Sequence, residues 1–242
     1  MQVHEWMMVN PTTISPKTKY TEAFRLLHVK KLHALPVVDR EGQLVGILTE
    51  KDLLDISPVA VLGVHTISDL LSAMAIEEAM TRRVITVPED YPLEEAARML
   101  IDNKIGSLPV MRGDQLVGMI TESDIFQAMT DALGGRSEGV RITLRLSEDK
   151  GELGAITDGI LQLGGKLVSL STYWEDNPFK RIITLKVQEV NREELLMMLE
   201  WTIAVQVIDF CETRGESQAT TNTEVFPNLN LDANIPWLLD SK

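Results

Sequence analysis

The sequence predicts an α+β protein in two parts, a small unit built twice and then a sheet-and-helix sandwich of another kind. The first observation is an internal repeat: residues 7–53 align with residues 80–125 at an offset of 73, which falls to 72 after a one-residue loop deletion. The second is a glycine-rich break at 134–139, after which strict apolar alternation begins. A repeated unit predicts a pseudo-twofold arrangement. We therefore expect a cleft between the copies and a ligand site in it.

The composition is that of a folded, acidic protein. The chain has 242 residues, 44% of them hydrophobic, and a formal net charge of −13. This charge argues against nucleic-acid or anionic-membrane partners, which favour a basic footprint, but it allows a local basic pocket for one phosphate. Cys211 has no partner for an internal disulfide, we find no signal peptide, and no apolar run approaches the ~20 residues of a membrane span. We expect a cytoplasmic protein.

Each repeat has the same order of local signals. A β-branched segment, 12–14 or 85–87, predicts a short strand, and apolar residues at helical spacing predict a helix after it. A hairpin follows, with strands at 35–38 and 44–48 and their counterparts at 108–111 and 116–120. A second helix begins after Thr49 or Thr121, each an N-cap residue with an Asp three positions later.

The C-terminal part has a different order. Alternation over 140–146 predicts a half-buried strand, followed by a helix that ends at Gly164-Gly165. Two more strands, a helix capped by Asn191 and a last strand complete the order βαββαβ, which predicts a ferredoxin-like sandwich. The polar composition of residues 212–242 predicts a disordered tail, with one apolar island at 235–239.

The domain boundaries follow from these breaks. We expect six segments: a first repeat at 1–58, a connection at 59–79, a second repeat at 80–133, a linker at 134–139, the sandwich at 140–211 and the tail at 212–242.

The repeat resembles a CBS domain, and the two copies resemble a CBS pair, or Bateman module. The matching residues are the runs 35–39 and 46–52 with their second-copy counterparts. The βαββαβ unit is similar to an ACT domain, although its loop at 149–154 lacks the Pro-Gly of that family's Asp-x-Pro-Gly-x-Leu pattern. The order CBS–CBS–ACT is similar to the acetoin-utilisation protein AcuB family, which implies a link to acetoin or central carbon metabolism.

The CBS resemblance implies an adenine-nucleotide site in each repeat. In that family the Gly-h-h-Thr-x-x-Asp element (h, apolar) binds ribose, where a carboxylate accepts hydrogen bonds from hydroxyls and the Thr hydroxyl and helix N-terminus meet phosphate. The short first strand supplies adenine contacts. The implied site residues are Thr13, Ile14, Gly46, Thr49, Asp52, Thr86, Val87, Gly118, Thr121 and Asp124. The alternative is that Thr and Asp only cap the helix, and the two roles are compatible.

Four lysines lie near the expected cleft, where they could reach phosphates or simply form a solvated helix face: Lys30, Lys31, Lys51 and Lys104. The copies differ there, since His33 aligns with Gly106 and Lys51 with Ser123. We expect the two sites to differ in affinity or occupancy.

The ACT resemblance implies an amino-acid site at the loop after the first strand of the sandwich. Its residues would be Asp149, Lys150, Gly151 and Gly154. The alternative is that the glycines permit tight packing and the unit only dimerises.

No catalytic or metal-ligand constellation stands out, so we expect no enzyme and no catalytic cofactor. The leading interpretation is a ligand-sensing regulatory protein. Its ligand would be AMP, ADP, ATP or S-adenosylmethionine, and the linker would relay binding to the ACT-like unit or to a partner protein. The alternative is a structural subunit that dimerises without a small molecule. We expect a homodimer in either case.

Overall fold

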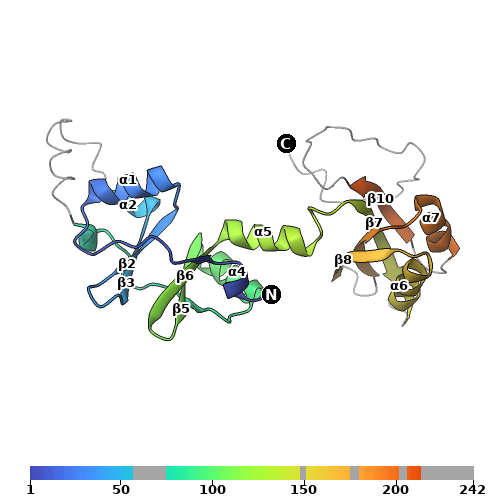
Figure 1. The fold of residues 1–242 in the computed structure, drawn as a ribbon, viewed down its shortest axis with the longest axis horizontal. Helices are drawn as coiled ribbons and strands as arrows, with labels where there is room; N and C mark the ends of the chain where they lie inside the picture. The colour runs from blue at the N-terminus through green and yellow to red at the C-terminus, as the bar shows by residue number, and fades with distance from the viewer. Residues whose placement is uncertain (57–74, 148–150, 175–179, 202–205, 214–242) are drawn as a thin grey trace.

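The computed structural model describes residues 1–56, 75–147, 151–174, 180–201 and 206–213. The two repeats form one body and the C-terminal unit another, and helix α5 (Glu122–Ala132) runs from the first toward the second (Figure 1). No helix in the described part of the chain is long and apolar enough to cross a membrane.

The first repeat contains the predicted helix, hairpin and second helix. Its elements are η1 (Val3–Glu5), β1 (Met8–Val9), α1 (Tyr20–Lys30), β2 (Ala34–Val38), β3 (Leu44–Thr49) and α2 (Glu50–Ile56). Helix α1 buries Ala23 and Leu27, one turn apart, against the β2–β3 hairpin, where Leu35 pairs with Leu48. Of the predicted strand at 12–14, only a single parallel bridge forms, from Ile14 to Val37.

The second repeat has the same order of short 3-10 helix, helix, hairpin and helix. Its elements are η2 (Ile76–Glu78), β4 (Val87–Pro88), α4 (Leu93–Asn103), β5 (Ser107–Arg112), β6 (Gln115–Thr121) and α5. Its short strand β4 aligns with residues 14–15 and not with β1. The predicted strand at 85–87 appears as β4, shifted toward its C-terminal end, because parallel pairing with β5 starts only at Val87. The sheet order is β1-β6-β5-β4, so one strand of this sheet comes from the first repeat.

The segment at the start of each repeat, which we call its entry segment, packs against the other repeat. Residues Met8 and Val9 pair with β6, and Val3 is fully buried in the core of the second repeat. Reciprocally, Ile76 and Met80 pack into the core of the first repeat. The cores are therefore interlocked, and residues at the start of each repeat lie against the other one.

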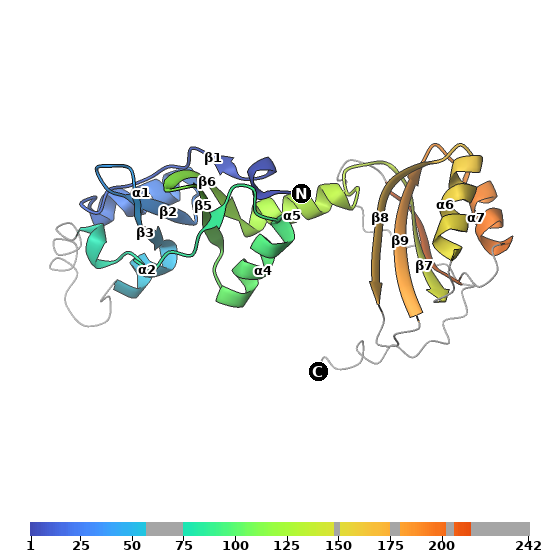
Figure 2. The ribbon, with the colours of Figure 1, turned by 90° about the horizontal axis from the view of Figure 1, so that it is seen from below.

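The C-terminal unit has the predicted βαββαβ order. Its elements are β7 (Gly139–Ser147), α6 (Glu152–Gln162), β8 (Lys166–Trp174), β9 (Lys180–Gln188), α7 (Arg192–Trp201) and β10 (Gln206–Thr213). The antiparallel sheet has the order β10-β7-β9-β8, and both helices cover one face of it (Figure 2). Alternate residues of β7, such as Ile142 and Leu144, are fully buried beneath those helices.

The last strand continues past the boundary expected at residue 211. Glu212 pairs with Val140 and Thr213 with Gly139, so both residues belong to the sheet and not to the tail. The physical reason is that β7 already starts at Gly139 and offers these two residues a pairing partner. The rest of the predicted tail, with its apolar island at 235–239, lies outside the described residues.

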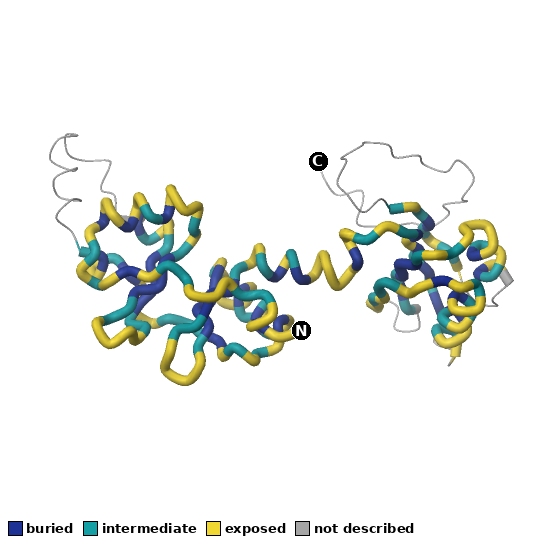
Figure 3. The backbone as a smooth tube through the Cα atoms, viewed as in Figure 1, coloured by how far each residue is buried: buried dark blue, intermediate teal, exposed yellow. Residues whose placement is uncertain are grey.

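The glycine-rich linker is anchored on the C-terminal sheet. Lys186 of β9 is only 4% exposed, and its Nζ donates a hydrogen bond to the Gly134 carbonyl at 2.7 Å. The Ser169 hydroxyl donates to the Leu133 carbonyl at 3.0 Å. Burial lowers the pKa of Lys186. The end of α5 is thus tied to the sheet, and Gly134 is buried within an otherwise exposed stretch (Figure 3).

Candidate functional site: paired cavities between the repeats

The first of two related cavities holds Asp52. We call it the Asp52 cavity; its volume is about 410 Å³. The start of α2 contributes Thr49, Lys51 and Asp52, and the segment before β4 contributes residues 83–85. The loop between α4 and β5, residues 104–106, and the first residue of β5, Ser107, also line it. One repeat thus supplies the Thr–Asp pair and the other supplies the facing wall.

The second, or Asp124 cavity, has the same plan with the repeats exchanged. Its volume is about 250 Å³. The start of α5 contributes Thr121, Ser123 and Asp124, which face residues 11–12, the α1–β2 loop at 31–33 and the first residue of β2, Ala34. The cavities are neighbours, because His33 and Ser107 line both of them.

The Thr–Asp pair forms the predicted capping box in both repeats. Asp52 Oδ2 accepts from the Thr49 backbone N–H at 2.8 Å and from its hydroxyl at 2.7 Å, and the Asp52 N–H donates back to the Thr49 hydroxyl at 3.2 Å. Asp124 and Thr121 repeat this pattern at 2.8, 2.6 and 3.3 Å.

Capping leaves one carboxylate oxygen of each aspartate for other partners. Within the described residues, Oδ1 of Asp52 and Oδ1 of Asp124 accept no hydrogen bond. Both side chains are half-buried and both line a cavity. Each cavity therefore offers an anionic acceptor in a fixed orientation, which suits a ligand that presents hydroxyl donors.

A lysine in left-handed conformation lines each cavity. Lys31 has φ 52° and ψ 43°, and Lys104 has φ 53° and ψ 45°. This conformation is strained for residues other than glycine, and such strain clusters at binding sites. Lys51 also lines its cavity, whereas Lys30 donates to the Thr12 hydroxyl at 3.0 Å.

The structure does not bring all implied site residues to these cavities. Thr13 is exposed and Ile14 is buried in the first core. Residues 11–12 and 83–85, which precede the implied residues in the chain, line the cavities instead. Local sequence pattern gives no signal for this offset, because the cavities are formed by segments of both repeats that are distant in the chain.

Gly46 and Gly118 allow the entry segment of one repeat to pack closely against the other repeat. A Cβ at Gly46 would meet Met80 Sδ at 2.6 Å, and a Cβ at Gly118 would meet Met7 Sδ at 2.4 Å. Neither glycine lines the Asp52 or Asp124 cavity. Their role in the structure is the close approach of the two repeats.

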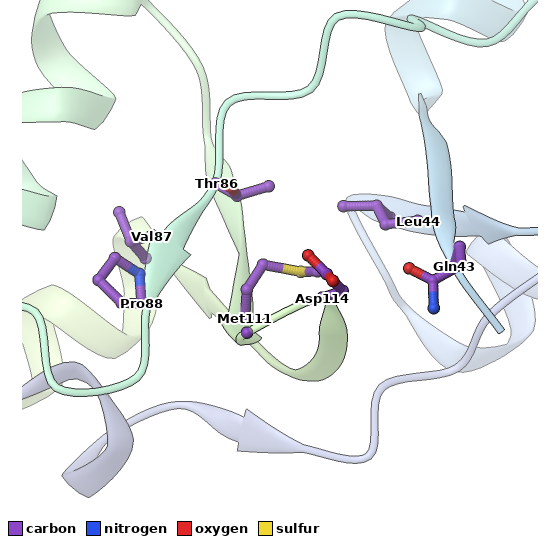
Figure 4. A pocket seen from close by; sticks show the side chains of 8 residues that line it. Gln43, Leu44, Thr86, Val87, Pro88, Met111 and Asp114 are labelled. Atoms are coloured by element: carbon purple, nitrogen blue, oxygen red, sulfur yellow. The ribbon is translucent and has the colours of Figure 1, made fainter.

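Thr86 and Val87 line a third cavity of about 530 Å³ (Figure 4). Gln43 and Leu44 of the first repeat face Thr86, Met111 and Asp114 of the second. Among the described residues that line it, Asp114 is the one ionisable residue. A phosphate would meet an acidic group and no cation of this described lining, so the cavity does not suit a nucleotide.

The ACT-like loop is only partly described. Asp149 and Lys150 lie outside the described residues. Gly151 has φ 120° at the N-cap of α6, and Gly154 lies in that helix with nothing within 4 Å of its Cβ position. Neither glycine lines one of the three cavities. No group of His, Cys, Asp and Glu in the described residues could hold a metal ion.

Comparison with known proteins decides the family. The CBS domain model matches residues 3–58 and 76–131. A CBS domain-containing protein of Dictyostelium discoideum is 30% identical over 134 residues, which cover 54% of this chain and 92% of the relative. The chain belongs to the CBS-domain family. Residues 3–131 form a tandem CBS pair, and the C-terminal unit has no family assignment.

Several other proteins match over about half of this chain. The inosine-5'-monophosphate dehydrogenase of Aquifex aeolicus is 33% identical over 144 residues, which are 56% of this chain but 27% of that enzyme. The chain thus spans about a quarter of the enzyme. Among solved structures, one described as an acetoin utilization protein (AcuB) from Vibrio cholerae is 29% identical, with 55% of this chain and 93% of that chain covered and a TM-score of 0.48. The structure of CBSX2 in complex with AMP is also 29% identical, with coverages of 53% and 95% and a TM-score of 0.45.

Proposed function

We propose that this CBS-pair protein is a ligand-sensing regulator that binds an adenine nucleotide, AMP, ADP or ATP, in the Asp52 and Asp124 cavities. The observation that carries the proposal is the unused Oδ1 of each aspartate, held in a cavity that a lysine also lines. A ribose presents two neighbouring hydroxyl donors to such an oxygen. Lysines that line the same cavities would pair with the phosphate, and apolar residues such as Val84, Ile85 and Pro11 would cover the base.

The relay part of the proposal rests on α5. This helix begins in the Asp124 cavity at its N-cap, Thr121, and its C-terminal end leads to the Gly134 carbonyl held by Lys186. A ligand shifts the arrangement of the two bodies only if it binds the two arrangements with different affinity. We take the C-terminal unit as an ACT-like receiver, and on the AcuB resemblance we extend the role to acetoin or central carbon metabolism.

The test separates ligand binding from helix capping. In Asp52→Asn/Asp124→Asn the amide oxygen still accepts from the threonine, while an NH₂ group replaces Oδ1 and cannot accept from ribose. Calorimetry with AMP, ADP, ATP and S-adenosylmethionine should show binding by the wild type. The double variant should lose roughly 1.5–3 kcal/mol of binding free energy, or about 10- to 100-fold in affinity, because a hydrogen bond to a charged group is lost.

The control is the melting temperature without ligand. It should stay close to the wild-type value because the capping contacts remain, whereas Asp52→Ala/Asp124→Ala removes cap and ribose acceptor together. Equal nucleotide affinity of the wild type and the Asn double variant would refute the role of Oδ1. Absence of binding by the wild type to all four compounds would favour the structural, dimerising alternative.

A further inference from the structure

The two cavities carry different charge although they share one backbone plan. Among the described residues, three lysine or arginine side chains line the Asp52 cavity: Lys51, Arg83 and Lys104. One lysine, Lys31, lines the Asp124 cavity, and His33 lines both. The repeat alignment explains the difference, because Lys51 corresponds to Ser123 and Arg83 to Asn10, while Lys104 corresponds to Lys31.

The acidic residues do not cancel this difference. Glu50 and Asp52 line the Asp52 cavity, and Asp124 lines the other. Glu50 Oε1 lies 3.9 Å from His28 Nε2 on α1, so part of its charge faces that imidazole. None of Lys51, Arg83 and Lys104 forms an ion pair within the described residues, and all three are exposed. Their charges are available to a ligand.

The three cations converge from separate elements. Lys51 lies in the first turn of α2, Arg83 lies before β4, and Lys104 ends α4. A guanidinium can bind two phosphate oxygens at once, and an ammonium adds a point charge. Arg83 and Lys104 belong to the second repeat, whereas Asp52 belongs to the first. A chain of phosphates attached to a ribose at Asp52 would therefore have cations on more than one side.

The cavity sizes differ in the same sense. The Asp52 cavity measures about 410 Å³ and the Asp124 cavity about 250 Å³. Small-molecule pockets typically enclose about 300–1,000 Å³, so the first has room for a larger ligand and the second lies at the small end.

We propose that the Asp52 cavity selects a nucleoside di- or triphosphate and that the Asp124 cavity takes an adenine nucleoside with at most one phosphate. This inference rests on the proposed function, since it assigns a ligand class to each of its sites. Lys51 and Arg83 are the specificity-determining residues, because they are the cations without a counterpart in the Asp124 cavity.

The experiment uses full-length chains with one cavity disabled at a time. Asp124→Asn leaves the Asp52 cavity intact, and Asp52→Asn leaves the Asp124 cavity intact. Calorimetry should give the Asp124→Asn protein an ATP affinity at least tenfold above its AMP affinity, and the Asp52→Asn protein no preference for ATP. The salt dependence of ATP binding should be steeper for the first protein, because exposed charges are screened.

Matched exchanges then test the two residues. Lys51→Ser/Arg83→Asn, built on Asp124→Asn, should lower ATP affinity at least tenfold and change AMP affinity less than threefold. The reverse exchange, Ser123→Lys/Asn10→Arg on Asp52→Asn, should raise the ratio of ATP to AMP affinity. Since all four positions are exposed, these variants are expected to fold.

The outcomes are distinguishable. The same ratio of ATP to AMP affinity in both single-cavity proteins would refute this inference but not the proposed function. Absence of nucleotide binding by both proteins would refute the proposed function itself. Inorganic tripolyphosphate is the second probe. It should bind the Asp52 cavity at least tenfold more weakly than ATP, and equal affinity would refute the nucleoside part of the assignment.

Discussion

The two CBS repeats share residues at positions where the backbone is constrained and differ at some of the side chains that line the cavities. The glycines at 46 and 118 allow close approach of the partner repeat, and the Thr–Asp pairs cap a helix. Around these shared positions, Lys51 is replaced by Ser123 and Arg83 by Asn10. At these positions the shared residues serve packing and capping, whereas the two replacements change the charge that lines each cavity. Variants that compare equivalent positions can test this division.

The largest expected effect is a loss of stability where the entry segment of one repeat packs against the other repeat. Gly118→Ala places a Cβ 2.4 Å from Met7 Sδ and 3.0 Å from the Met8 carbonyl oxygen, which is backbone and cannot rotate away. In Gly46→Ala the closest atom is also a methionine sulfur, but the nearest backbone oxygen, of Thr81, is 3.2 Å away. Overpacking of this kind costs about 1–3 kcal/mol. Chemical denaturation should show both losses, with Gly118→Ala the larger.

The control for these two variants is Gly154→Ala. This glycine lies within α6 with open space around its Cβ position, so alanine should stabilise the C-terminal unit by about 0.5–1 kcal/mol through helix propensity. A Gly118→Ala protein as stable as wild type would show that the entry segment is not held as closely as the structure indicates.

A second asymmetry is that α5 of the second repeat leads into an anchored linker. Lys186→Met keeps the length of the side chain but removes the donor to the Gly134 carbonyl. The unpaired acceptor should cost about 1–3 kcal/mol, less the gain from no longer burying a charge. Denaturation of the C-terminal unit is the measurement, and Lys166→Met, at an exposed position of β8, is the matched control that should change little.

The pH dependence sharpens this test. Burial lowers the folded-state pKa of Lys186 below its ordinary value of 10.5, so the cost of burying the charge is fully present below the folded pKa. That cost is relieved as pH rises through the folded pKa toward 10.5. Wild type should therefore gain stability relative to Lys186→Met over this window. A constant difference across it would mean that the lysine is solvated in the folded protein.

Sequence predicted the elements well because the hydrophobic period is strong. The α1 positions Ala23 and Leu27 and the alternating residues of β7 are buried as their spacing requires. The capping boxes were also readable, since they need only residues three apart. The residues that form the walls of the cavities could not be predicted from the sequence. Arg83 and Asp52 line one cavity although they come from different repeats, and this approach of distant parts of the chain leaves no local pattern.

A smaller effect is expected at the strained lysines. Lys31→Gly and Lys104→Gly relieve the same left-handed conformation, and glycine's greater freedom in the unfolded chain offsets part of the gain. Each should stabilise the protein by up to about 1 kcal/mol, a rise of about 2–4 °C in melting temperature. The comparison lies in the ligand: Lys104→Gly should weaken ATP binding at the Asp52 cavity, and Lys31→Gly should not. Equal loss of ATP affinity in both variants would contradict the separate assignment of these lysines.

The smallest effect concerns an ion pair found in the second repeat at a position where the first repeat has Pro16 in place of Glu89. Arg112 Nη2 donates to Glu89 Oε2 at 2.6 Å, and this hydrogen bond lowers the pKa of Glu89 from its ordinary value of 4.5. The stabilisation is therefore present above pH 4.5 and is lost as pH falls through the lowered pKa. Arg112→Ala should reduce the melting temperature slightly at pH 7, and the difference from wild type should shrink at pH 3 and also in 1 M salt, because exposed pairs are screened.

Arg40→Ala, in the corresponding hairpin of the first repeat, removes a cation that has no ion pair in the described residues and should show no such pH dependence. A difference between wild type and Arg112→Ala that persists unchanged at pH 3 would mean that Arg112 stabilises the second repeat by packing of its side chain, and the charge difference between the repeats at this position would then have no energetic consequence.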